Sequence, residues 1–287
     1  MDLAHRIETA MADRLRAQLS ADAFRDDYPT YLRDLRSNLI AGVAPQDFQS
    51  DLAGGSGNEL LPHGSEPPKF CSARSSSALA VNTFGPFRQV PARLTLLGQR
   101  EFHHAWFERR CPNGLRTRIL PHLDFLAETS TSVVGIESKF AEPFGFVKPA
   151  TFSSQYRRLF YGEGRRPAVA EAPWKAVYDL LLNQPSAYLH LDAAQLVKHY
   201  LGLKNTYPTK KRFLLYLYWE PSNAKDFEAF AAHRAEVTDF AERVSGCDTH
   251  LVGLPYRTLW TDWERSSPWP GMHAHLARLR ARYDVAI

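Results

Sequence analysis

Apolar residues recur with two different periods along the chain, and each period predicts a different kind of element. A repeat of about four positions predicts a helix over residues 3–19 and a second helix over roughly 29–41. The stretch 50–70 is rich in Gly, Pro and Ser, which predicts a loop and the best candidate boundary in the chain. We therefore expect an N-terminal helical extension, residues 1–50, followed by one larger domain, residues 51–287.

From about residue 101 the pattern changes to short apolar runs separated by turn residues. FHHAWFERR, TRILPHLDFLAE and SVVGIESKF predict three successive strands, RFLLYLYWEP a buried strand, and THLVGLPYRTLW one more strand. Helices are expected over 78–83, 151–161, 171–183 and 224–244, from Asp192 onward, and near the C-terminus from about Met272. This order of elements predicts an α/β fold with a mixed sheet covered by helices.

Composition narrows the class of protein. A hydrophobic fraction of 44% over 287 residues is enough for a real core. No apolar run reaches membrane-spanning length, and the N-terminus lacks the apolar centre of a signal peptide, so we expect a cytoplasmic protein with no membrane contact. Cys71, Cys111 and Cys247 are far apart and form no CxxC pair, which argues against a zinc ribbon and favours packed, reduced thiols.

The third predicted strand carries charges that an apolar strand does not need. Because side chains alternate along a strand, Glu137 and Lys139 share one face, while Ile136, Ser138 and Phe140 share the other. Asp124 lies on the preceding predicted strand, and the segment between them is short enough for a hairpin. Buried charges are costly unless they are paired or bound to metal, so these three residues point to a site.

The residue types favour metal-assisted hydrolysis. Two clustered carboxylates repel each other unless a cation lies between them, and Mg²⁺ prefers oxygen ligands completed by water and phosphate. Mn²⁺ takes similar ligands and is expected to substitute. A neighbouring lysine can orient an attacking water or stabilise charge on phosphorus. Together these groups provide the chemistry of phosphodiester hydrolysis.

The spacing of Asp124, twelve further residues and then Glu137-Ser138-Lys139 resembles the D…ExK signature of the PD-(D/E)XK nuclease superfamily. The string LPHLDFLAETSTSVVGIESKFAEPF is similar to a restriction-endonuclease-like branch of it, and the likeness covers about residues 55–219. One departure is that Pro121 precedes the aspartate by three positions instead of directly, which weakens the motif more than the function.

The resemblance implies a restriction-endonuclease-like αβββαβ core, with a mixed central sheet flanked by helices. It implies that Asp124, Glu137 and the main-chain carbonyl of Ser138 bind Mg²⁺, and that Lys139 positions the hydrolytic water. It also implies a nucleic acid substrate, with DNA favoured over RNA. Many such enzymes dimerise to cut both strands, so a homodimer is a further expectation.

Gln195 resembles a glutamine that faces the active site in several nuclease branches, and Lys198, His199 and Tyr200 follow it in the same element. The alternative is a helix cap, because Asp192 and Gln195 stand in the D-x-x-Q spacing of a capping box. Both roles can hold at once.

Three further acids have open roles. Glu59 can approach the site from the first core helix, Glu108 can line its edge, and Glu142 can serve as an accessory ligand. The alternatives are a loop acid, a strand-end acid and a solvated acid after the strand.

Basic residues cluster after the ExK strand, with aromatic residues between them. Such a set suits contacts to phosphates that position nucleic acid without reading its sequence. For each single pair, a solvated helix face or turn is the simpler explanation. The set comprises Arg157 and Arg158, Arg165 and Arg166, Lys198, Lys204, Lys210, Lys211 and Arg212.

The sequence therefore favours a metal-dependent nuclease with two alternatives. One is a non-catalytic nucleic-acid-binding or assembly module on the same fold. The other is an unrelated α/β protein with a surface ion pair, which predicts that Glu137 and Lys139 are exposed and distant from Asp124.

Overall fold

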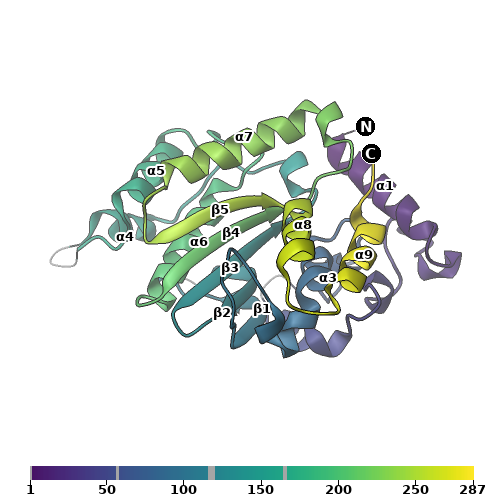
Figure 1. The fold of residues 1–287 in the computed structure, drawn as a ribbon. Coiled ribbons are helices and arrows are strands. Elements are labelled where there is room, and N and C mark those ends of the chain that lie inside the picture. Colours follow the sequence, from purple (N-terminus) through teal and green to yellow (C-terminus); the bar gives the residue numbers. More distant parts are fainter. Residues whose placement is uncertain (1, 56–57, 116–119, 164–166) are drawn as a thin grey trace.

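A computed structural model describes residues 2–55, 58–115, 120–163 and 167–287. Its centre is a five-stranded mixed sheet in the order β1-β2-β3-β4-β5 (Figure 1). β1 to β3 pair antiparallel, whereas β3–β4 and β4–β5 pair parallel. The strands are β1 (His104–Arg110), β2 (His122–Glu128), β3 (Ser132–Lys139), β4 (Lys211–Tyr218) and β5 (Thr249–Pro255).

Helices cover both faces of the sheet, as the α/β prediction required (Figure 1). One hydrophobic core lies between the sheet and α1, α3, α8 and α9, and a second lies between the sheet and α4 to α7. The helices are α1 (Leu3–Arg16), α2 (Gln49–Ala53), α3 (Ser76–Gln89), α4 (Arg157–Tyr161), α5 (Ala172–Asn183), α6 (Ala193–Thr206), α7 (Glu228–Arg243), α8 (Tyr256–Ser266) and α9 (Met272–Tyr283).

β3 is the central strand, and seven of its eight residues are buried, all except Lys139. Val134 and Ile136 face the first core while Val133 faces the second, which is the alternation expected of a strand covered on both sides. Gly135 permits the close packing here, because a Cβ at this position would lie 2.5 Å from Leu123 Cδ1.

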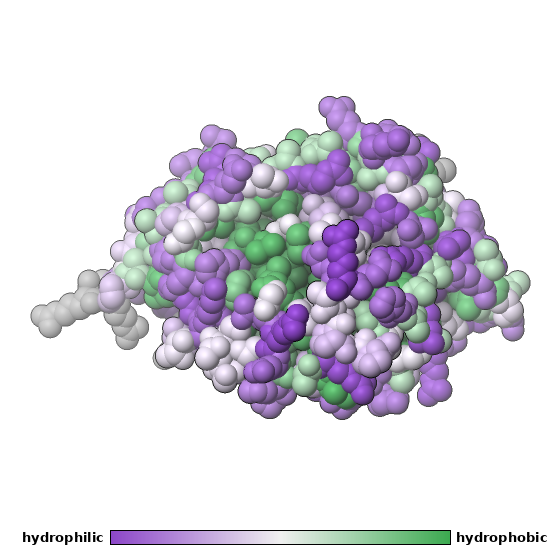
Figure 2. Space-filling model, viewed as in Figure 1, coloured by the Kyte–Doolittle hydropathy of each residue, from purple (hydrophilic) through white to green (hydrophobic). Residues whose placement is uncertain are grey.

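β5 forms one edge of the sheet and is less covered than β3. Most of its residues are only half-buried. Figure 2 shows apolar side chains gathered at the centre of one face of the molecule, over the region where Figure 1 shows β4 and β5. Within the described residues, no helix is long and apolar enough to cross a membrane.

The predicted helix over 29–41 is wrong. The segment instead makes isolated bridges and a short 3₁₀ turn, Arg36–Asn38. Side chains compete with a helix for the backbone: Asp34 Oδ1 accepts hydrogen bonds from the N–H groups of Arg36 and Ser37. The amide of Asn38 donates to two main-chain carbonyls more than 30 residues away, which ties the segment to the region before α3.

The strand predicted over 249–260 is correct only as far as Pro255, where α8 begins. Tyr256, Leu259, Trp260 and Trp263 are buried at helical spacing. Periodicity in the short apolar run LVGLPYRTLW could not locate this change, because both elements bury their apolar residues.

The N-terminal helix α1 ends at Arg16, three residues before its predicted end. Ile7, Met11 and Leu15 are buried in the same core as Phe125 of the sheet. The N- and C-termini lie close together beside this core (Figure 1). A division of the chain at residue 50 stays a prediction.

Candidate active site

Asp124 and Glu137 are neighbours on β2 and β3, at the point where the pairing of these two strands stops. The last paired residues are Phe125 and Ile136. Beyond them, Asp124 Oδ2 accepts a hydrogen bond from the main-chain N–H of Ser138 at 2.6 Å. The alternative of an exposed ion pair far from Asp124 is therefore wrong, since the Glu137 side chain is only 3% exposed.

Glu137 is held between two nitrogens. Lys139 Nζ donates to its Oε1 at 2.6 Å, as expected for residues two apart on one face of a strand. His199 Nε2, from α6, lies 2.8 Å from its Oε2. The second contact lacks hydrogen-bond alignment, so Glu137 Oε2 and both ring nitrogens of His199 are buried without a hydrogen-bond partner among the described residues.

Burial raises the pKa of Glu137, but the positive charge of Lys139 and the contact with His199 outweigh it and lower this pKa to about 2. The pKa of Asp124 moves the other way. Burial raises it well above its usual range, and the neighbouring carboxylates of Glu137 and Glu108 raise it further. The carboxylate of Glu137 is thus stabilised in its charged form by Lys139, whereas ionisation of Asp124 is opposed by burial and by the neighbouring carboxylates.

The Lys139 ammonium is also held by Gln195. Gln195 Oε1 accepts a hydrogen bond from Lys139 Nζ at 2.8 Å. The main-chain N–H of the same glutamine donates to Oδ1 of Asp192, the residue that caps α6, at 2.9 Å. Gln195 therefore takes part in the helix cap and also faces the site. The pKa of Lys139 is raised, because Glu137, Glu142 and Asp124 outweigh the effect of burial.

Glu108 lies opposite Asp124 on β1, between the partnered pairs Phe107–Phe125 and Arg109–Leu123. Its φ of +46° is unusual for a residue with a side chain. Its Oε2 lies 3.3 Å from His122 Nδ1.

The other two candidate acids are more loosely connected to the centre. Burial raises the pKa of Glu59, although Lys69 and Ser77 oppose this shift. Glu142 begins a 3₁₀ turn after β3, Glu142–Phe144, and its Oε2 accepts from the N–H of Phe140 at 2.7 Å. Glu142 is exposed and lies just after β3, as the alternative of a solvated acid expected, and it also caps the end of that strand.

A pocket of about 740 Å³ opens beside these groups. It brings acids from β1 and β2 together with polar side chains of α6 and aromatic side chains of the segment before α4. Its lining includes Glu108, His122, Asp124, Phe152, Tyr156, Gln195, Lys198 and His199.

The carboxylates fit a hard divalent cation. Among the described residues Asp124 makes no ion pair, and Glu137 Oε2 has His199 Nε2 at 2.8 Å without a hydrogen bond, so both side chains offer the carboxylate oxygens that such an ion prefers. Within the described ranges, no cluster of three or more His, Cys, Asp or Glu side chains is arranged to hold a metal. A pair of carboxylates is compatible with Mg²⁺, because that ion keeps several waters or phosphate oxygens as ligands.

The basic set is only partly available for phosphate contacts, and Arg165 and Arg166 lie outside the described residues. Lys210 pairs with Glu128 at 2.7 Å. Lys204 and Arg212 belong to an internal network described next. Lys198 instead lines the pocket.

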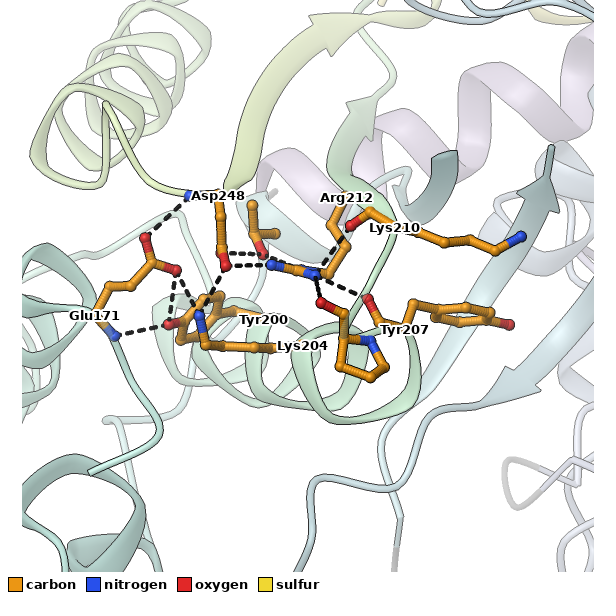
Figure 3. A network of polar contacts seen from close by, with 9 residues as sticks. Glu171, Tyr200, Lys204, Tyr207, Lys210, Arg212 and Asp248 are labelled. Atoms are coloured by element: carbon orange, nitrogen blue, oxygen red, sulfur yellow. Dashed lines mark hydrogen bonds and ion pairs between the residues drawn. The ribbon is translucent and has the colours of Figure 1, made fainter. Parts of the chain in front are cut away.

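Lys204 and Arg212 meet in a polar network at the C-terminal half of α6 (Figure 3). Lys204 Nζ lies 2.9 Å from both Glu171 Oε1 and Asp248 Oδ2. The Tyr200 hydroxyl accepts from the N–H of Glu171 at 2.9 Å. These contacts join the start of α5, the body of α6 and the start of β5.

Arg212, at the beginning of β4, is 3% exposed and completes this network (Figure 3). It pairs with Asp248, and its Nε donates to Thr249 Oγ1 at 3.0 Å. Its Nη1 donates to the main-chain carbonyls of Tyr207, Pro208 and Lys210. Arg212 is therefore a structural residue and not a phosphate contact.

Sequence reasoning missed one neighbour of the site. The Tyr256 hydroxyl lies 2.7 Å from Ser138 Oγ and belongs to the stretch predicted as a strand. No local signal links residues 118 positions apart. His199 was noted only as a neighbour of Gln195, while Tyr200 points away from the site and stacks on Trp174 at 4.1 Å.

Comparison with known proteins assigns the family. The model of a family described as "restriction endonuclease associating with ARP" matches residues 9–284. No curated protein and no solved structure matches the chain. Since the match covers nearly the whole sequence, this chain belongs to that restriction-endonuclease-like family.

Proposed function

We propose that this protein is a metal-dependent nuclease of the PD-(D/E)XK type that hydrolyses phosphodiester bonds, with DNA as its substrate. The observation that carries the proposal is the meeting of Asp124, Glu137 and Lys139 at the separated ends of β2 and β3. The order α3-β1-β2-β3-α6-β4 corresponds to the αβββαβ core of that superfamily and supports the same assignment.

In this proposal Asp124, Glu137 and the carbonyl of Ser138 hold Mg²⁺, or Mn²⁺ in its place. The bound ion supplies charge stabilisation at phosphate and a more acidic water. Lys139 orients the attacking water through its ammonium, which Glu137 and Gln195 hold from two sides at 2.6 and 2.8 Å. Gln195 positions Lys139, and a fixed geometry of this kind lowers the cost of reaching the transition state.

The family description supports a partner as well as an activity. We propose that the chain works with an ARP protein, as the family description states for its members. Cutting both strands of a duplex needs two centres, which a homodimer would provide.

The test is cleavage of supercoiled plasmid with Mg²⁺, Mn²⁺ or EDTA, by wild type, Asp124→Ala and Lys139→Ala. Lys210→Ala is a matched control, because Lys210 is 19% exposed, pairs with a carboxylate and lies off the pocket lining. We expect metal-dependent nicking or linearisation by wild type and the control, and none by the two site variants. Cleavage by Lys139→Ala would contradict the proposal.

A second candidate is a binding or assembly module without catalysis. The ion pair between Lys139 and Glu137 favours it, because a lysine satisfied by a carboxylate has less freedom to hold a water. Metal-independent binding of DNA, with no cleavage in either metal by the folded protein and its partner, would favour this candidate.

A further inference from the structure

We propose that the pocket beside the active site binds one unpaired nucleotide, with its base stacked on Phe152 and its phosphate held by Lys198. The inference rests on the proposed nuclease function and deepens it by naming the substrate class: single-stranded nucleic acid, or a duplex with a nucleotide turned out of the helix.

Phe152 is an aromatic side chain that the core holds but does not enclose. It is half-buried and lines the pocket. Tyr156 and Tyr178 pack against it, with ring centroids 5.5 and 4.9 Å away. The hydroxyl of buried Tyr156 accepts from Asn113 Nδ2 at 2.8 Å, which fixes this support. The result is a rigid ring with part of its surface open to the pocket, as a stacking platform requires.

Lys198 provides a positive charge that the protein itself does not neutralise. Its Nζ lies 5.7 Å from the Phe152 ring centroid. Within the described ranges it makes no ion pair, unlike Lys139, Lys204 and Lys210. A half-exposed ammonium over an aromatic ring can contact a phosphate while the ring contacts the base.

Helix α6 places this platform next to the reacting groups. Adjacent residues on a helix diverge by about 100°, so Lys198 and His199 point in different directions. His199 contacts Glu137 at 2.8 Å, and Lys198 lies over Phe152. Both line the same pocket together with Asp124. A nucleotide on Phe152 would therefore occupy the same pocket that Asp124 and His199 line.

An unpaired base is the occupant that fits these features. A pocket of about 740 Å³ is in the range that encloses a small organic group. A base inside a duplex is stacked on both faces and has no free face for a side chain, whereas an unpaired base does.

The test is fluorescence anisotropy in EDTA, which measures binding without cleavage, using a labelled 20-mer of thymidine and a blunt duplex of equal length. We expect Phe152→Leu to weaken binding of the single strand at least about fivefold and Phe152→Tyr to preserve it. Lys198→Gln should weaken it and reduce the slope of log K against log salt by about 0.7. Phe227→Leu is a matched control, since Phe227 is half-buried under Arg6 at 4.9 Å and lies in the other core.

Unchanged single-strand binding by Phe152→Leu would overturn the inference, as would equal losses in Phe152→Leu and Phe227→Leu. Absence of nucleic acid binding by the wild-type protein would overturn it as well. The binding assay and the plasmid cleavage assay test the two proposals independently. Normal cleavage with unaffected single-strand binding would reject the nucleotide pocket alone, and Phe152-dependent binding without cleavage would reject the nuclease alone.

Discussion

Two clusters of charge lie along the same helix, α6, and they are built differently. Gln195 and His199 on its N-terminal half face the candidate active site, whereas Tyr200 and Lys204 on its C-terminal half belong to the network of Figure 3. In the network, the side chain of buried Arg212 is bonded by a carboxylate, a hydroxyl and three carbonyls. In the site, Glu137 Oε2 and His199 Nε2 are buried 2.8 Å apart and make no hydrogen bond.

The difference separates a structural role from a functional one. Buried polar groups in proteins are almost always satisfied, so atoms left without partners need an explanation. The charged side chains of the network, Lys204 and Arg212, have partners, and they join α6 to α5, β4 and β5. The network thereby sets the position from which Gln195 and His199 reach β3. In the site, Glu137 Oε2 lies 2.8 Å from His199 Nε2 without a hydrogen bond, and burial and neighbouring carboxylates raise the pKa of Asp124, a repulsion that a bound cation would relieve.

The largest expected effect is on stability, and it tests the network. Arg212→Met should lower the free energy of unfolding by about 3 kcal/mol, because the three main-chain carbonyls that accept from its Nη1 lose this donor, although Lys204 still pairs with Asp248. Urea denaturation measures this effect. Arg243→Met removes an exposed i,i+4 pair with Asp239 and should cost at most about 1 kcal/mol. Equal costs would mean that the network is not a structural anchor.

The next effect is on catalysis. Gln195→Ala should lower kcat by roughly 10- to 100-fold, because Lys139 loses one of the two groups that hold its ammonium. Single-turnover cleavage measures it, while anisotropy in EDTA should find DNA binding unchanged. Gln195→Glu, which keeps an oxygen acceptor, should retain more activity than Gln195→Ala. A loss of binding in place of kcat would show that Gln195 contacts substrate instead of positioning Lys139.

A smaller effect should have opposite signs for stability and activity. Asp124→Asn should raise the free energy of unfolding at pH 7 by on the order of 1 kcal/mol while removing cleavage. The raised pKa of Asp124 means that the folded state resists its ionisation, so its contribution to stability worsens as the pH rises above the unfolded value of 3.8. Thermal melts at pH 4.5 and 7 should show a larger gain at pH 7. A destabilised Asp124→Asn protein would show that its bond to Ser138 outweighs the repulsion.

The effect that is smallest at pH 7 concerns a buried histidine that, unlike His199, makes no ion pair with a carboxylate among the described residues. His233 Nε2 lies 3.0 Å from the Tyr216 hydroxyl, and burial followed by the charges of His190 and Arg234 lowers the pKa of His233 to about 3. The unfolded chain takes up this proton near pH 6.5, so stability is complete above that pH and falls as the pH drops towards 3. The slope from this group is at most about 1.4 kcal/mol per pH unit.

His233→Gln, which can keep the bond to Tyr216, should flatten the stability profile between pH 6 and 4. Urea denaturation at three pH values in this range measures the slope. An unchanged slope would mean that His233 is protonated in the folded state.

The sequence determined the local parts of the site. The period of two along β3 placed Glu137 and Lys139 on one face, and their 2.6 Å contact follows from that spacing alone. The short hairpin brought Asp124 alongside, and the Asp192 cap aligned Gln195 on α6. Each of these relations spans few residues, so periodicity and capping rules are sufficient to predict it.

Only the tertiary structure decided the rest, because it depends on contacts between residues far apart in the chain. The segment 29–41 lost its predicted helix to bonds with the region before α3, and the helix α8 placed Tyr256 beside Ser138. Arg212 and Lys204 look like phosphate contacts in the sequence and prove to be internal anchors, since their partners come from α5 and β5. A charged residue carries no mark of its partner in its own neighbourhood, and folding alone decides whether that charge is satisfied inside the protein or left for a substrate.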